Sequence, residues 1–156
     1  KDFLGLASVT LPDVDFIVAT VSGAGIAGNV EAPIIGHMNA MTAQLKFRTF
    51  SAESLKLQEP REHNIDLRAP QQVYDPIAGV YKTQSVKHVL VLVPKTLSNG
   101  NIAPASPTDG SGSYAVRRWV TYIDDAKVME LDPYNYICEV NGVDYLSDTR
   151  KALGKS

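Results

Sequence analysis

The feature that most constrains the fold is a regular alternation of apolar and polar residues in the stretch MTAQLKFRTF, residues 41–50. Every second side chain in its first part is apolar: Met41, Ala43, Leu45 and Phe47. Successive side chains of a β-strand point to opposite faces, so this spacing predicts a strand with one buried and one wet face. The stretch therefore indicates a sheet that packs on one side.

Strand patterns recur along the rest of the chain. They cover residues 15–21, 63–69, 80–94, 114–123, 126–131 and 136–140. The second half of 80–94 is apolar on both faces, which predicts that it is covered on both sides. Asp124-Asp125 and Asn141-Gly142 have the composition of tight hairpin turns. Short turns between neighbouring strands favour antiparallel pairing.

Helix signals are few. Ser51 is a predicted N-cap of a short helix that ends before Pro60, and residues 145–153 have helical spacing before Gly154. Residues 98–113 contain almost nothing to bury, so they are predicted to form a mobile loop. We expect a single domain over 1–156, mainly β, built as an antiparallel β-sandwich or partly closed barrel with one or two short helices.

The charge balance limits the possible partners. The chain has 15 Lys and Arg residues against 17 Asp and Glu residues, so it lacks the basic excess typical of dedicated nucleic-acid binders. Its one cysteine, Cys138, cannot form an internal disulfide and is expected to be a buried thiol. No stretch reaches the roughly 18 apolar residues of a membrane span, so no stable membrane insertion is expected.

A glycine motif raises the possibility of nucleotide binding. Gly23, Gly25 and Gly28 in VSGAGIAGN match the G-x-G-x-x-G spacing of dinucleotide sites. Such a site needs a helix that starts within the glycine loop and holds the pyrophosphate. Here Pro33 and Gly36 would break that helix. We therefore interpret the segment as a bent loop between strands and expect no cofactor.

No residue pattern indicates catalysis. His37, His63 and His88 are far apart and match no metal-binding spacing. Cys138 has no base beside it in the sequence that would mark it as a nucleophile. We expect neither enzyme activity nor a bound metal. Two classes of function stay open: a barrel that binds a ligand in its mouth, and a subunit that assembles through its strands and loops.

Four segments carry a resemblance to a known family: GIAGNVEAPIIGHM at 25–38, FRTFSAESLKL at 47–57, residues 63–95 and residues 127–154. Over most of its length the chain resembles the major tail tube protein of contractile-tailed bacteriophages and of related phage-tail-like particles. The resemblance implies a fold similar to that of the type VI secretion tube protein, in which the sheets of neighbouring subunits join around a ring.

The resemblance also implies a function. Subunits would form hexameric rings that stack into a hollow tube inside a contractile sheath, which drives the tube through the target envelope. Double-stranded DNA would then pass through the tube without tight binding. The implied partners are other copies of the chain, the sheath, tape-measure, tail terminator and baseplate proteins. The implied location is the virion tail, assembled in the host bacterial cytoplasm.

Alternatives and candidate contact residues follow from the same reasoning. One alternative is the inner tube of a DNA-free, bacteriocin-like contractile particle, and another class is a β-barrel ligand-binding module. We hypothesise that residues 22–38 contact a neighbouring subunit, because they are glycine-rich, partly apolar and flanked by strands. The candidate interface residues are Gly23, Gly25, Ile26, Gly28, Ile34 and Ile35.

Overall fold

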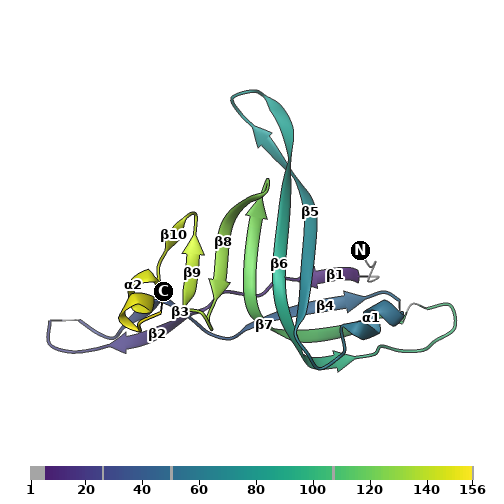
Figure 1. The fold of residues 1–156 in the computed structure, drawn as a ribbon, viewed down its shortest axis with the longest axis horizontal. Helices are drawn as coiled ribbons and strands as arrows, with labels where there is room; N and C mark the ends of the chain where they lie inside the picture. The colour runs from purple at the N-terminus through teal and green to yellow at the C-terminus, as the bar shows by residue number, and fades with distance from the viewer. Residues whose placement is uncertain (1–5, 26, 50, 107, 156) are drawn as a thin grey trace.

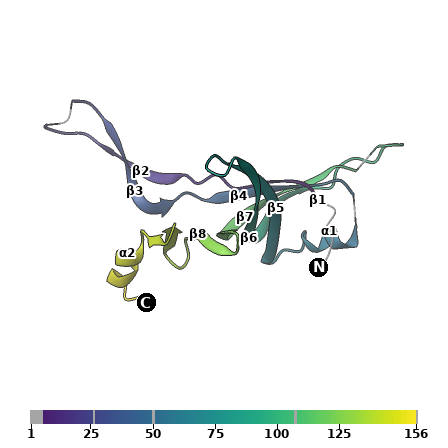
Figure 2. The ribbon, with the colours of Figure 1, turned by 90° about the horizontal axis from the view of Figure 1, so that it is seen from above.

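The structure is a computed structural model that describes residues 6–25, 27–49, 51–106 and 108–155. Within these residues the chain is mainly β, with antiparallel pairing throughout and two short helices, as the sequence predicted (Figure 1). One large sheet forms the body of the molecule, and a separate two-stranded hairpin projects from it (Figures 1 and 2).

The large sheet is organised around the long strand β7 (Gly110–Ile123). The first half of β7 pairs with β4 (Met41–Phe47), and its second half pairs with β8 (Ala126–Asp132). Along its other edge, β7 pairs over nearly its whole length with β6 (Val80–Ser98). One strand therefore connects both halves of the sheet.

Shorter strands extend this sheet at its edges. β1 (Leu6–Thr10) pairs with β4, and β9 (Ile137–Val140) and β10 (Val143–Asp144) follow β8. β5 (His63–Asp75) pairs with β6 along its full length. Because β7 meets β6 only from Val86 onward, the far ends of β5 and β6 form a two-stranded ribbon that rises above the sheet (Figure 1).

The core lies on the face of β4 that the alternation predicted. Met41, Ala43, Leu45 and Phe47 are all buried there. They belong to one hydrophobic cluster with residues of five other strands and of the segments next to the two helices: Leu57, Ile65, Leu90, Leu92, Tyr114, Val116, Trp119, Leu131, Cys138 and Leu146. Burying one such apolar side chain stabilises a fold by about 1.5–3 kcal/mol. This cluster therefore holds the large sheet together.

An irregularity in β7 lets two residues three positions apart share the inner face. Val116 pairs with Leu92 and Arg118 pairs with Val91, so Arg117 is an extra residue in the strand. A β-bulge of this kind shifts the alternation by one position. As a result Val116 and Trp119 are both buried in the core cluster. The Trp119 indole N–H donates a hydrogen bond to Nδ1 of His88 at 3.2 Å.

Both predicted helices are present. α1 (Ala52–Lys56) begins after Ser51, whose hydroxyl accepts a hydrogen bond from the Ser54 N–H at 3.2 Å, while the Ser54 hydroxyl accepts one from the Ser51 N–H. This reciprocal cap confirms the predicted start of the helix. α2 (Ser147–Ala152) ends just before Gly154, whose φ of +69° is a conformation that favours glycine.

Two predicted loops are shorter in the structure. Residues 30–38 are not part of a loop: they form β3 (Val30–Met38), which pairs with β2 (Phe16–Val21). The loop expected at 98–113 is also shorter, because β6 continues to Ser98 and β7 begins at Gly110. In both cases a partner strand extends the pairing into residues whose composition alone indicated a loop. The mobility of the remaining residues between β6 and β7 stays a prediction.

Candidate assembly interface

The hairpin of β2 and β3, residues 16–38, is the part of the molecule that stands apart from the body. We call it the arm. Within the described residues its two strands pair only with each other. Figures 1 and 2 show the arm projecting away from the large sheet, with its turn at the far end. Both faces of most of its length are therefore open to solvent.

The arm exposes an unusual amount of apolar side chain. Every residue of β2 is exposed, although the strand reads FIVATV. In β3, Ile34 is exposed and Ile35 is 71% exposed. An isolated two-stranded hairpin is marginally stable in water, and a continuous exposed apolar patch usually marks an interaction site. The arm thus has the composition of a buried element, yet it has no partner strand among the residues that the structure describes.

The glycine motif forms the turn of the arm. Gly25 and Gly28 have φ values of +95° and +118°, which favour glycine, and no atom lies within 4 Å of where their side chains would begin. Gly23 lies in the same exposed turn. A strand, not a helix, follows the turn. The segment therefore lacks the helix N-terminus that a dinucleotide site needs.

Two further candidate residues lie in a bulge of β3. Phe16 pairs with Met38 and Val18 pairs with Pro33, so residues 34–37 of β3 face one residue of β2. Ile34 and Ile35 lie in this bulge and contribute to the exposed apolar surface. Ile26 lies outside the described residues. The structure thus places all described candidates on the arm, two of them in the bulge and three in the turn.

The base of the arm is attached to the body. The Asn39 N–H donates a hydrogen bond to the Asp15 carbonyl at 2.7 Å, which closes the hairpin at its base. Val14 and Met38 pack against the core cluster. Gly36 is buried, in contrast to the exposed residues on either side of it. The arm is therefore anchored at one end only.

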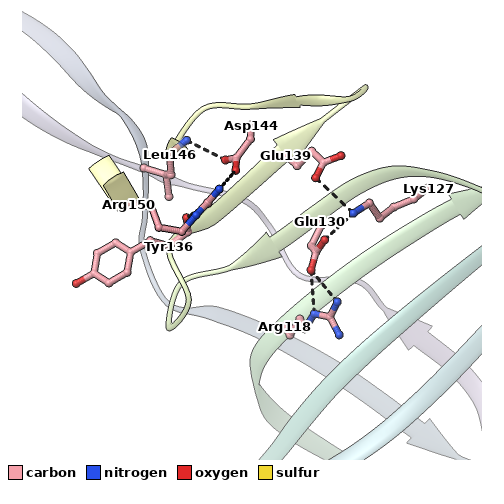
Figure 3. A network of polar contacts seen from close by, with 8 residues as sticks. All are labelled: Arg118, Lys127, Glu130, Tyr136, Glu139, Asp144, Leu146 and Arg150. Atoms are coloured by element: carbon pink, nitrogen blue, oxygen red, sulfur yellow. Dashed lines mark hydrogen bonds and ion pairs between the residues drawn. The ribbon is translucent and has the colours of Figure 1, made fainter. Parts of the chain in front are cut away.

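The C-terminal segment forms a polar network beside this base (Figure 3). The Arg150 guanidinium forms an ion pair with Asp144 at 2.7 Å and donates to the Tyr136 carbonyl at 2.9 Å. The other carboxylate oxygen of Asp144 accepts from the Leu146 N–H at 3.1 Å. Burial alone would raise the pKa of Asp144, but the hydrogen bonds from Arg150 and the Leu146 N–H lower it on balance.

A second network links three strands of the large sheet (Figure 3). Glu130 of β8 and Glu139 of β9 lie directly opposite each other, which alone would be repulsive. Lys127 contacts both carboxylates, at 2.8 and 3.3 Å, and Arg118 of β7 contacts Glu130 at 2.7 Å. Burial alone would raise the pKa of Glu130, but Lys127 and Arg118 lower it on balance. Balanced charges therefore hold these strands together.

The tip of the β5–β6 ribbon is a second exposed apolar region, which the sequence patterns did not single out. Ile77 in its turn is 97% exposed, and the rings of Tyr74 and Tyr81 lie 5.2 Å apart on either side of the turn. Two tyrosines that flank a short Asp-Pro-Ile-Ala-Gly turn were the available signal. This tip shares its chemistry with the arm but is carried by strands of the large sheet.

Sites of other kinds are not found in the described part of the chain. No group of three potential metal ligands comes together there. Cys138 is buried, and burial raises the pKa of its thiol, which disfavours the reactive thiolate. Within the same residues, no helix has the length and apolar character required to span a membrane.

Comparison with known proteins adds the family. No curated protein matches the chain in sequence. A family model described as phage tail tube protein FII matches residues 1–154, nearly the whole chain. The match includes the arm, the large sheet and α2. The chain therefore belongs to the phage tail tube protein FII family.

Proposed function

We propose that this chain is the repeating subunit of a contractile phage tail tube, in which hexameric rings stack around a channel that conducts DNA. Membership of the tail tube family makes the chain a structural component of a phage tail and implies assembly into a tube. The observation that carries the proposal is the arm, an apolar hairpin with no partner strand within the described residues.

The arm fits a contact between copies of the chain. A head-to-tail contact joins two different patches of one subunit and closes into a ring when the rotation between copies allows it. An arm that reaches outward can cover a patch on the next copy, while its own base stays anchored to the first. Ile34 and Ile35 would lose their exposure in such a contact. The gain from burying apolar area would then stabilise the ring.

The charge of the chain supports the passage of DNA. Each phosphate that a Lys or Arg neutralises makes binding stronger and more dependent on salt. The chain has a formal net charge of −2, so it has no overall excess of cations to retain DNA. We propose a channel without a net basic surface. Lys46 and Arg48, which are both exposed, are the residues to examine once the channel face is known.

The wider setting is proposed on the same basis. The sheath, the tape-measure protein, the tail terminator and the baseplate are the proposed partners, and assembly would take place in the host bacterial cytoplasm. Contraction of the sheath would drive the tube through the envelope of the target cell. These partners follow from a contractile tail, whereas the arm bears on contacts between copies of the chain.

Electron microscopy with mass photometry tests the proposal. The purified chain is examined over a concentration series, with a baseplate seed added to a parallel series. Rings or hollow tubes with six subunits per ring are expected. The variant Ile35→Ser should shift the chain toward monomers in both series, because it places a hydroxyl in the proposed contact.

Ile102→Ser is the matched control, because Ile102 is an equally apolar side chain, fully exposed in the connection between β6 and β7. It should form tubes as the parent chain does. If the parent chain forms no tube even on a seed, the proposed function is wrong. If Ile35→Ser forms normal tubes, the assignment of the arm as a subunit contact is wrong.

A further inference from the structure

We propose that the C-terminal segment, residues 144–154, fixes the direction of the arm by seating the side chain of Leu146 on Gly36. The inference rests on the proposed function of the arm as a subunit contact, and it identifies the residues that position that contact. An arm anchored only at its base needs such a device, because a contact surface reaches its partner only from a limited range of directions.

Gly36 is where the arm meets the segment. It is the buried residue of β3, and within the described residues neither β2 nor the rest of β3 has another. A Cβ atom added to Gly36 would lie 2.5 Å from Cδ2 and 2.7 Å from Cγ of Leu146. Carbon atoms do not approach so closely without displacement, so the leucine occupies the space that any other residue at 36 would need.

The backbone of Gly36 brings it to this contact. Its φ is +78°, a conformation that residues with a side chain rarely adopt. It lies in the bulge of β3, where residues 34–37 face a single residue of β2. The bulge therefore turns one backbone position toward Leu146 while Ile34 and Ile35 remain exposed. The bulge thus accounts both for the contact of Gly36 with Leu146 and for the exposure of Ile34 and Ile35.

Leu146 connects this contact to the body of the molecule. It is 3% exposed and belongs to the core cluster that also contains Leu45 and Tyr114. Its position is fixed from the polar side as well, because its N–H donates to Asp144, which Arg150 holds by an ion pair (Figure 3). Arg150 in turn donates to the Tyr136 carbonyl, which ties α2 to the turn before β9. The core cluster and the polar network thus hold residues 144–154 in place against the body of the molecule.

Energy transfer within one chain measures the direction of the arm. Trp119 is the only tryptophan of the sequence and serves as the donor in the body. Ser22→Cys places a thiol for an acceptor dye in the exposed turn of the arm. Cys138 is buried, so brief labelling favours the new thiol. Labelled chains are measured alone, at a concentration below that at which rings or tubes form, so that each acceptor reports on the Trp119 of its own chain.

Gly36→Ala should shift the transfer efficiency, because the added methyl group cannot fit beside Leu146. Gly79→Ala is the matched control: Gly79 also has a positive φ, +65°, but has open space around it. Both alanine variants bear backbone strain, whereas only the first has the clash. Adding Leu146→Ala to Gly36→Ala removes the leucine atoms and should return the transfer efficiency toward that of the parent chain.

Equal transfer in Gly36→Ala, Gly79→Ala and the parent chain would overturn the inference, provided that circular dichroism shows folded protein. So would a shift in Gly36→Ala that the added Leu146→Ala leaves unchanged. Arg150→Gln is a milder variant if Gly36→Ala does not fold, and it should broaden the distribution of transfer efficiencies. These results on monomers are independent of the tube assay, so the positioning role and the proposed function can fail separately.

Discussion

β4 and the arm have similar apolar content but opposite environments. In β4 every second side chain is buried, whereas all six residues of β2 are exposed. The difference lies in the neighbours: β4 pairs on both edges and packs on the core cluster, while β2 pairs with β3 alone among the strands that the structure describes. Burial therefore depends on partners as well as on composition. The arm has no such partner in the described part of the chain, and the proposed partner is another copy.

The largest expected effect tests this contrast directly. Leu45→Ala should lower the free energy of unfolding of the monomer by about 2–5 kcal/mol, because it opens a cavity in a close-packed core. Ile35→Ala on the arm should change it by less than about 0.5 kcal/mol, because that side chain is 71% exposed in the monomer. Chemical denaturation of both variants under conditions that prevent assembly provides the comparison.

Ile102→Ala serves as the reference for truncating an exposed isoleucine outside the arm. The contrast between the sheet and the arm would break if Ile35→Ala destabilised the monomer as much as Leu45→Ala does. That result would mean that the arm folds back onto the body in solution.

A glycine provides the next largest effect. Gly112 of β7 lies opposite Leu45, and a Cβ atom at Gly112 would lie 2.7 Å from the ring of the fully buried Tyr114. Gly112→Ala should therefore destabilise the monomer by about 1–3 kcal/mol through overpacking. Ser111→Ala, on the exposed neighbouring position, should have little effect. Thermal unfolding followed by circular dichroism measures both.

If Gly112→Ala unfolds at the same temperature as the parent chain, the core beside β7 is looser than its burial indicates. The packing of the large sheet would then differ less from that of the arm than the buried fractions indicate. A clear loss of stability would sharpen the distinction, since glycines of the arm turn have open space around them.

A smaller effect is expected at the start of α1, which lies outside both β4 and the arm. Ser51→Ala removes the side-chain acceptor for the Ser54 N–H and should cost about 1 kcal/mol of stability. Ser106→Ala, in an exposed connection, is the control and should be neutral. Equal midpoints of denaturation for the two variants would show that the cap adds nothing to the stability of the sheet.

The smallest expected effect is on the pH dependence of the free energy of unfolding, and it arises from Glu130 in the large sheet. The pKa of Glu130 is lowered from its ordinary value of 4.5, so its contribution to stability is complete above that value. It is lost as the pH falls through the lowered pKa of the folded state. Stability should therefore decrease as the pH falls below the ordinary value of 4.5, and less steeply in Glu130→Gln. Identical slopes would exclude Glu130 as a contributor.

Local patterns predicted the parts of the fold that depend on near neighbours. The alternation at 41–47 identified the buried face of β4, and Ser51 and Gly154 marked ends of the two helices. Asp124, Asp125 and Asn141 have positive φ values, as the predicted tight turns require. In each case the physical cause lies within a few residues, so one sequence contains it.

Features that depend on distant residues could not be predicted in this way. Pro33 and Gly36 indicate a broken segment when considered alone, but pairing with β2 makes β3 a strand with a bulge. The contact between Gly36 and Leu146 joins positions far apart in the sequence, and no local pattern marks it. The extra residue at Arg117 likewise depends on how β6 lies beside β7. The sequence marked the arm as a candidate interface, which stays a prediction, whereas the contact between Gly36 and Leu146 became visible only in the structure.

β7 pairs with strands that come before it in the sequence. The part of the chain before the connection between Ser98 and Gly110 and the part after it are therefore combined in one sheet. β4 and β6 come before this connection in the sequence, yet both form their edges against β7, which follows it. A protease that cuts between Ser98 and Gly110 would leave two fragments, each holding strands that only the other completes. Neither could bury its core residues by itself, so the severed halves should remain associated. The fold thus offers a place where the protein could be expressed as two complementary pieces.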